Sequence, residues 1–181
     1  MKGVLSKMGT TMMPERRRFL QLAAMGGVAL MGVVTAGVRP GWAGGHAEAL
    51  LLSCMDYRLV DDVERYMAGR GLRDNYDHVV LAGASLGALV SNKPTWGQTF
   101  WDHLEVASNL HAIKKVILMD HRDCGAYKVF LGEDFGRDRA RETVVHAEQL
   151  KKLATLIKEK HAKLETETLL MSLDGQVEAI L

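Results

Sequence analysis

Short apolar runs alternate with helix-like patterns along most of the chain. Continuous apolar runs of this length are typical of strands that a parallel sheet buries on both faces. Three runs of this kind are expected strands: 49–53, 78–82 and 116–119. Apolar residues at helical spacing predict three helices, at 59–67, 95–112 and 139–163. The alternating order predicts a mainly parallel sheet with helices on both faces.

The end of the chain predicts an antiparallel pair of strands. The apolar run 168–173 is a fourth expected strand, and Asp174-Gly175 is a hairpin signal. Residues 176–180 are then expected to pair with it in the opposite direction. The fold class expected is therefore α/β, a mainly parallel β-sheet flanked by helices, with an antiparallel C-terminal edge strand.

Helix boundaries and loops are predicted from local signals. Thr95, with Gln98 three positions later, resembles a capping box and places a helix start there. Val144 is expected on the apolar stripe of the last helix. Residues 83–88 are expected to break the second strand, and 122–138 to contain a polar loop.

The first 43 residues are expected to be an export signal and not part of the fold. Residues 15–21 read Glu-Arg-Arg-Arg-Phe-Leu-Gln, which resembles the twin-arginine export motif. A weakly apolar run with four glycines follows at 22–38, and the small-residue site 41–43 is a cleavage point. The expected domains are a twin-arginine-type signal peptide at 1–43 and a folded domain at 44–181.

Cleavage near Ala43 would leave a periplasmic protein whose partner during export is the twin-arginine export machinery. The alternative is a membrane anchor that is never cut, although the apolar run is shorter than the ~20 residues that span a bilayer comfortably. The twin-arginine route moves folded proteins, often with metal already loaded. Export by that route therefore agrees with a metal centre built on thiols, which would otherwise risk forming a disulfide.

The charge of the chain depends on this leading segment. The formal net charge is +1, but without residues 1–43 the chain carries 17 basic and 21 acidic residues, a net of −4. No basic patch remains that would indicate a nucleic-acid partner. Hydrophobic content of 48% and charged content of 25% are close to the globular average.

Two of the expected strands end in residues that can bind metal. Cys54 follows the first strand, His121 and Cys124 follow the third, and the chain has two cysteines in all. Ligands bind beyond the carboxyl ends of parallel strands, and adjacent strands would bring the three together. This set, with Asp56 nearby, suggests a zinc site with one changeable position. A structural disulfide between the two cysteines is the alternative.

The two motifs Cys54-x-Asp56-x-Arg58 and His121-x-x-Cys124 together resemble the signature of the β-class carbonic anhydrase family. The resemblance runs from about residue 49 to residue 177. It implies a β-carbonic anhydrase-like fold and a Zn²⁺ cofactor held by the two cysteines and the histidine. It also implies a homodimer or a higher homo-oligomer.

The resemblance further implies reversible hydration of carbon dioxide to bicarbonate. Zinc would lower the pKa of a bound water from about 15.7 toward ~7, so that hydroxide is available to attack carbon dioxide. Asp56 would bind the metal in a closed resting form only. Arg58 would hold Asp56 away from the metal and orient it, so both are expected catalytic residues. The backbone N–H near Gly125 would bind the substrate and steady the developing anion.

Three departures from the family pattern leave alternatives open. Residues 81–85 lack the Arg and Asn usual in this loop, Asp120 stands where Gly is common, and Tyr57 where Ser or Ala is common. The zinc site could therefore hydrolyse carbonyl sulfide or carbon disulfide, or be non-catalytic and closed by Asp56. Histidines on the expected helices, among them His146, are expected to be solvated or half-buried.

Overall fold

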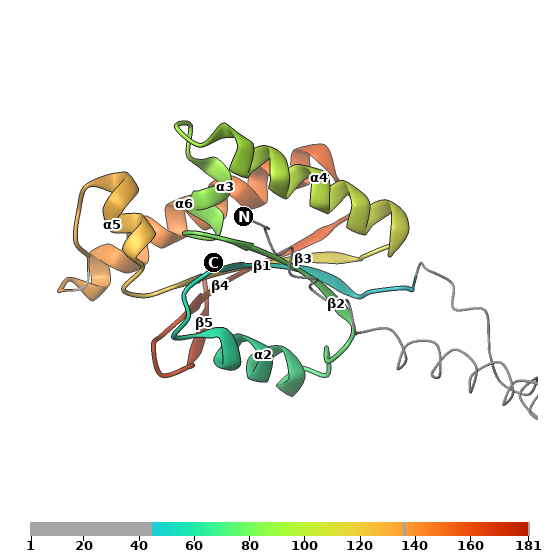
Figure 1. Cartoon of the computed structure of the whole chain (residues 1–181), viewed down its shortest axis with the longest axis horizontal. Helices are drawn as coiled ribbons and strands as arrows, with labels where there is room; N and C mark the ends of the chain where they lie inside the picture. Colours follow the sequence, from blue (N-terminus) through green and yellow to red (C-terminus); the bar gives the residue numbers. More distant parts are fainter. Residues whose placement is uncertain (1–44, 136, 181) are drawn as a thin grey trace, which may run out of the picture. The chain divides into compact units, whose positions relative to one another are not determined.

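A five-stranded sheet lies at the centre of the computed structural model, which describes residues 45–135 and 137–180 (Figure 1). The strands are β1 (Ala49–Cys54), β2 (Tyr76–Leu81), β3 (Lys115–His121), β4 (Glu165–Met171) and β5 (Val177–Ala179). Their spatial order is β2-β1-β3-β4-β5, with parallel pairing everywhere except between β4 and β5, which are antiparallel. The predicted fold class is confirmed, including the antiparallel C-terminal edge strand.

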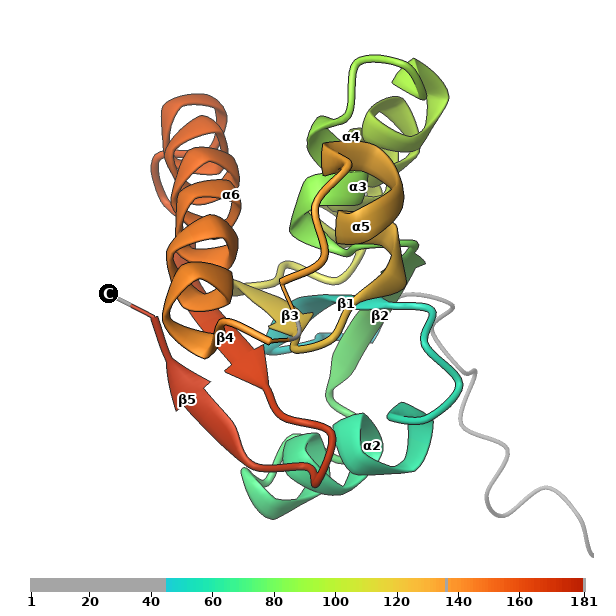
Figure 2. The same cartoon turned by 90° about the vertical axis from the view of Figure 1, so that its left-hand side faces the viewer.

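Helices cover both faces of the sheet, as the alternating pattern predicts. The helices are α2 (Val60–Gly69), α3 (Ser85–Leu89), α4 (Pro94–Leu110), α5 (Gly125–Leu131) and α6 (Arg139–Lys160). Helix α2 lies alone on one face, and α3, α4 and α6 lie on the other (Figure 2). Among these described helices none combines the length and apolar character needed to cross a bilayer. The expected signal peptide and its possible anchor fall on residues 1–43, outside the described part.

The core has two halves because side chains alternate across the sheet. Leu52 and Leu118 point toward α4 and α6, whereas Leu51 and Met119 point toward α2. All four are fully or almost fully buried, and burying one such side chain contributes about 1.5–3 kcal/mol. Burial on both faces explains why β1 and β3 appear in the sequence as unbroken apolar runs.

Helix α4 begins one residue earlier than its sequence signal indicates. Pro94 occupies the first helical position, which its fixed φ favours, and Lys93 precedes it without a side-chain cap. Thr95 therefore lies inside the first turn, where its carbonyl accepts from the Thr99 hydroxyl. Gln98 donates to Asp102 and not back to the helix start. The expected capping box was wrong.

Two short helices replace segments that were expected to be irregular. Helix α3 follows a turn in which Gly83 and Ala84 both have positive φ, and α5 ends at Gly132 with φ 73°. With five and seven residues, they are too short to show a helical period. The stripe of α6 also differs from expectation, since Val144 is 48% exposed and its neighbour Val145 is buried.

Candidate metal centre

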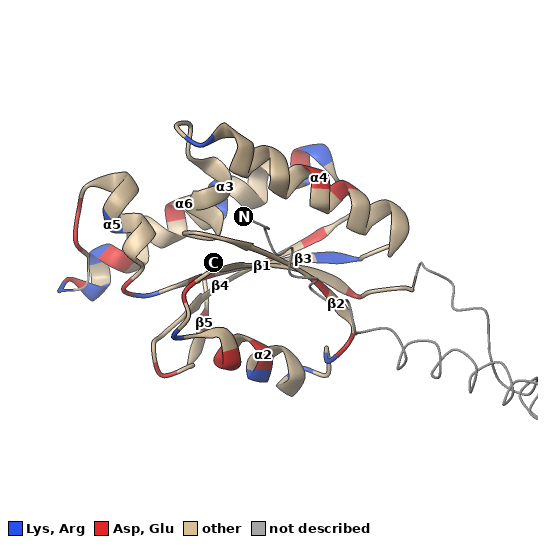
Figure 3. Ribbon diagram, viewed as in Figure 1, with Lys and Arg blue, Asp and Glu red and all other residues tan. Residues whose placement is uncertain are grey.

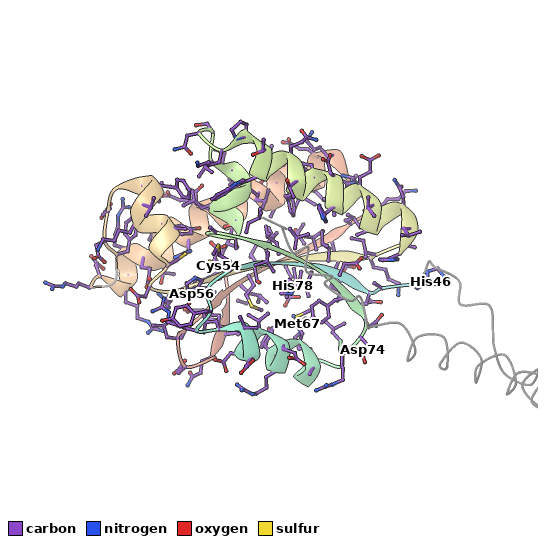
Figure 4. The ribbon with its side chains drawn as sticks, viewed as in Figure 1. His46, Cys54, Asp56, Met67, Asp74 and His78 are labelled. Carbon is purple, nitrogen blue, oxygen red and sulfur yellow. The ribbon has the colours of Figure 1, made fainter. Side chains whose placement is uncertain are left out.

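The ends of two neighbouring strands bring the predicted metal ligands together. Cys54 is the last residue of β1 and His121 the last of β3, and these strands pair in parallel. Cys124 follows three residues later, immediately before α5. The ligand atoms of the three residues lie within 4.8 Å of one another. Figure 4 shows Cys54 and Asp56 at the same end of the sheet, far from His46 at the other end.

The two thiols lie close enough to share a proton. Their Sγ atoms are 3.9 Å apart, well beyond the ~2.05 Å of a disulfide, and both cysteines are free. A hydrogen bond from Cys124 lowers the pKa of Cys54 to about 4, assisted by His121 and by the Gly83 N–H, which donates to the same sulfur. The pKa of Cys124 is raised by the same contact and by burial. One thiolate is therefore present at neutral pH, beside a second sulfur.

His121 is oriented for ligation. Its Nδ1 lies 2.8 Å from the Arg122 carbonyl oxygen, which can only accept, so Nδ1 carries the proton. Nε2 is buried and has no hydrogen-bond partner among the described residues. Burial lowers the pKa of His121, but the nearby Cys54 sulfur and the Arg122 carbonyl outweigh this effect, and the net pKa is raised. Two sulfurs and one such imidazole nitrogen form a donor set that fits zinc.

A carboxylate–guanidinium pair lies next to these ligands. Arg58 donates from Nε and Nη2 to the two oxygens of Asp56, at 2.9 and 2.8 Å. These bonds lower the pKa of Asp56 to about 2, so its carboxylate stays ionised. The Oδ2 atom of Asp56 is 3.7 Å from Nε2 of His121. The predicted pairing of Asp56 with Arg58 is present, and it lies at the edge of the metal-ligand group.

Arg58 also contacts Asp123, which the sequence motifs leave as a variable position. Its Nη1 donates to Oδ2 of Asp123 at 2.9 Å, and its Nη2 to the Asp123 carbonyl oxygen at 3.0 Å. Gly125, the predicted substrate contact, is the first residue of α5. Apart from its chain neighbours and the backbone of its own helix, no atom would lie within 4 Å of a Cβ at Gly125, so space is open there. Its substrate-binding role stays a prediction.

A buried polar network lies behind the metal ligands. Asp120 is 1% exposed and accepts hydrogen bonds from the Ser85 N–H at 3.0 Å, the Ser85 hydroxyl at 2.7 Å, and the Tyr127 hydroxyl. Nδ1 of His146 donates to the same carboxylate at 2.9 Å. Burial, followed by the Asp120 charge, raises the pKa of Tyr127 well above its usual value.

The expected solvation of His146 was wrong, since its ring is buried against Asp120. The network also connects two departures from the family pattern. Ser85 lies in the altered loop and Asp120 stands where Gly is common, and they bond directly to each other. The signal for this network was a carboxylate inside an apolar strand, because a buried charge requires partners.

Comparison with solved structures defines the class of the fold. β-Carbonic anhydrase isoform I of Trichomonas vaginalis is 16% identical, with a TM-score of 0.52, and the match covers 92% of this chain and 93% of that one. The β-carbonic anhydrase CafD of Aspergillus fumigatus is 13% identical, with a TM-score of 0.50, and the match covers 79% and 94%. Such distant similarity shows a β-carbonic anhydrase fold.

Similarity at the level of sequence places the chain in a family. The family model described as "Putative carbonic anhydrase" matches residues 45–181, and the chain belongs to this family. Uncharacterized proteins of Rickettsia conorii and Rickettsia bellii are each 47% identical over 136 residues, which is 75% of this chain and 73% and 82% of theirs. The Cys-His-Cys group of this family member could hold a metal ion such as zinc.

Proposed function

We propose that the protein is a zinc enzyme that hydrates carbon dioxide reversibly to bicarbonate. The observation that carries the proposal is the convergence of Cys54, His121 and Cys124 beside an ionised Asp56. The buried, unpartnered Nε2 of His121 supports it, because a metal ion would satisfy that atom. Zinc bound there supplies an activated water at neutral pH.

The remaining chemistry belongs to residues of the chain itself. Arg58 keeps Asp56 ionised, and Asp56 accepts a hydrogen bond from the attacking water and so orients it. The open space beside Gly125 suits a small substrate such as carbon dioxide. The developing negative charge on that substrate is steadied by the backbone N–H groups near Gly125.

Stopped-flow measurement with a pH indicator tests this function. The zinc-loaded protein is expected to speed carbon dioxide hydration, whereas Cys54→Ser, which replaces a thiolate with a hydroxyl, should lose both zinc and activity. Zinc content measured by mass spectrometry accompanies each rate. Native activity no higher than that of Cys54→Ser would refute the proposal.

Carbonyl sulfide or carbon disulfide is the second candidate substrate. The loop at 81–85 lacks the Arg and Asn side chains of the family pattern, and this favours a less polar substrate. Sulfide release from these gases, with little hydration of carbon dioxide, would support this candidate. No turnover of any of them, with Asp56 bound to the metal, would support a non-catalytic zinc protein.

We also propose export to the periplasm and assembly into a homo-oligomer. Export is supported by the twin-arginine motif in residues 15–21, and its test is cell fractionation after replacement of the paired arginines by lysine. Oligomerisation is supported by exposed apolar side chains at the site, Met55, Tyr57 and Val60. Light scattering coupled to size-exclusion chromatography measures the assembly, and a monomer at micromolar concentration would contradict it.

A further inference from the structure

The guanidinium of Arg58 is held on two sides. Its Nε and Nη2 donate to the Asp56 carboxylate. Its Nη1 donates to the Asp123 carboxylate, and its Nη2 also donates to the Asp123 backbone carbonyl. Asp123 is 65 residues from Arg58 in sequence and belongs to the loop after β3. Both basic and acidic residues lie at this end of the sheet (Figure 3). Arg58 therefore links the loop after β1 to the loop after β3.

Asp123 is itself held by a buried anchor. Its backbone has φ 54°, in the left-handed region, and its N–H donates to Oε1 of Glu142 at 2.6 Å. Glu142 is 4% exposed, and its other oxygen accepts from Nη1 of the buried Arg122 at 3.0 Å. The Asp123–Arg58 contact is thus connected to α6 through the hydrogen bond from the Asp123 N–H to Glu142. An isolated surface ion pair without such a connection would contribute little.

We propose that Asp123 is a positioning residue that keeps the Arg58–Asp56 pair away from the metal position. The proposal rests on the proposed function for the presence of a metal ion at Cys54, His121 and Cys124. Without the Asp123 carboxylate, Arg58 retains Asp56 and the backbone carbonyl of residue 123, so the Arg58–Asp56 pair is held less firmly and can move as a unit. Oδ2 of Asp56 already lies 3.7 Å from Nε2 of His121, so a small shift would bring it into the fourth metal position.

Azide binding to the Co²⁺-loaded protein measures access to that fourth position. The visible spectrum of Co²⁺ changes when azide binds, and a position filled by Asp56 weakens the apparent affinity in proportion to the closed fraction. Asp123→Asn is expected to weaken azide binding about two- to fivefold, the effect of losing one partly exposed charged contact. Asn tolerates a left-handed backbone, so the fold should persist.

Charge removal alone would act in the opposite direction, because a site with one fewer negative charge attracts azide more strongly. The same substitution in an Asp56→Asn background separates the two effects. With no carboxylate to close the site, Asp123→Asn should leave azide affinity unchanged or strengthen it. Asp102→Asn, which removes an exposed carboxylate on α4, is the matched control and should change nothing.

An equal effect of Asp123→Asn on azide affinity in both backgrounds would overturn the positioning role. Failure of the positioning role can be distinguished from failure of the proposed function. Coupling between Asp56 and Asp123 in azide binding, without carbon dioxide hydration by the zinc form, would support the positioning role and contradict the function. Hydration without coupling would overturn the positioning role alone.

Discussion

Replacing Asp120 with Asn should strongly destabilise the fold. The carboxylate is fully buried and accepts from two groups of Ser85, from the Tyr127 hydroxyl and from His146. Asn retains one acceptor oxygen and turns an NH₂ group toward the remaining donors. A hydrogen bond to a charged acceptor contributes about 1.5–3 kcal/mol, so the loss of two of them predicts a loss of about 3–6 kcal/mol.

Urea unfolding followed by circular dichroism measures this loss. The protein should be metal-free, because bound metal adds its own stabilisation to the folded state. Asp102→Asn, on the exposed side of α4, should stay within about 0.5 kcal/mol of the native protein. Ser85→Ala should cost much less in the Asp120→Asn background than in the native one. A loss below about 1 kcal/mol for Asp120→Asn would refute the central role of this carboxylate in the network.

Three further predictions test the site and the fold. Cys124→Ser should lower the zinc content, measured by mass spectrometry; native content would contradict its role as ligand. Arg58 lowers the folded pKa of Asp56 to about 2, below the ~3.9 of an unfolded chain. The stability that Asp56 contributes is therefore present above about pH 4 and lost as pH falls toward 2, where metal-free native protein should approach Asp56→Asn in urea unfolding. A difference in unfolding free energy between the two proteins that stays constant from about pH 4 to about pH 2 would contradict this. Gly87→Ala should cost about 1–3 kcal/mol, because its Cβ would lie 2.4 Å from the Ala82 carbonyl oxygen; an unchanged melting temperature would contradict it.

The sheet and the meeting of the metal ligands could be predicted because both follow from local patterns. Strands buried on both faces must be continuously apolar, and β1 and β3 show this directly. Cys54 and His121 end these strands, so their proximity needs only that the two strands be parallel neighbours. Short-range patterns therefore predicted a long-range contact, through the geometry of the sheet.

The contacts around those ligands could not be predicted in the same way. Asp123 binds Arg58 because its backbone is left-handed and Glu142 holds it there. Neither condition can be recognised from the motif His121-x-x-Cys124, in which position 123 is variable. His146 has a carboxylate partner 26 residues away on another element, so the helical pattern around it indicates only a helix. Helices as short as α3 and α5 give no periodic signal at all.

The sequence separation of the two cysteines has a consequence for folding. Cys54 and Cys124 are 70 residues apart. Cys54 ends β1, and the segment between the two cysteines contains α2, β2, α3, α4 and β3. A metal ion bound by both would act as a cross-link across that stretch. Closing a loop of this length costs about 4 kcal/mol of chain entropy in the cross-link model. Metal loading would thus favour a chain whose parallel strands have already paired, and the loaded ion would then slow their separation.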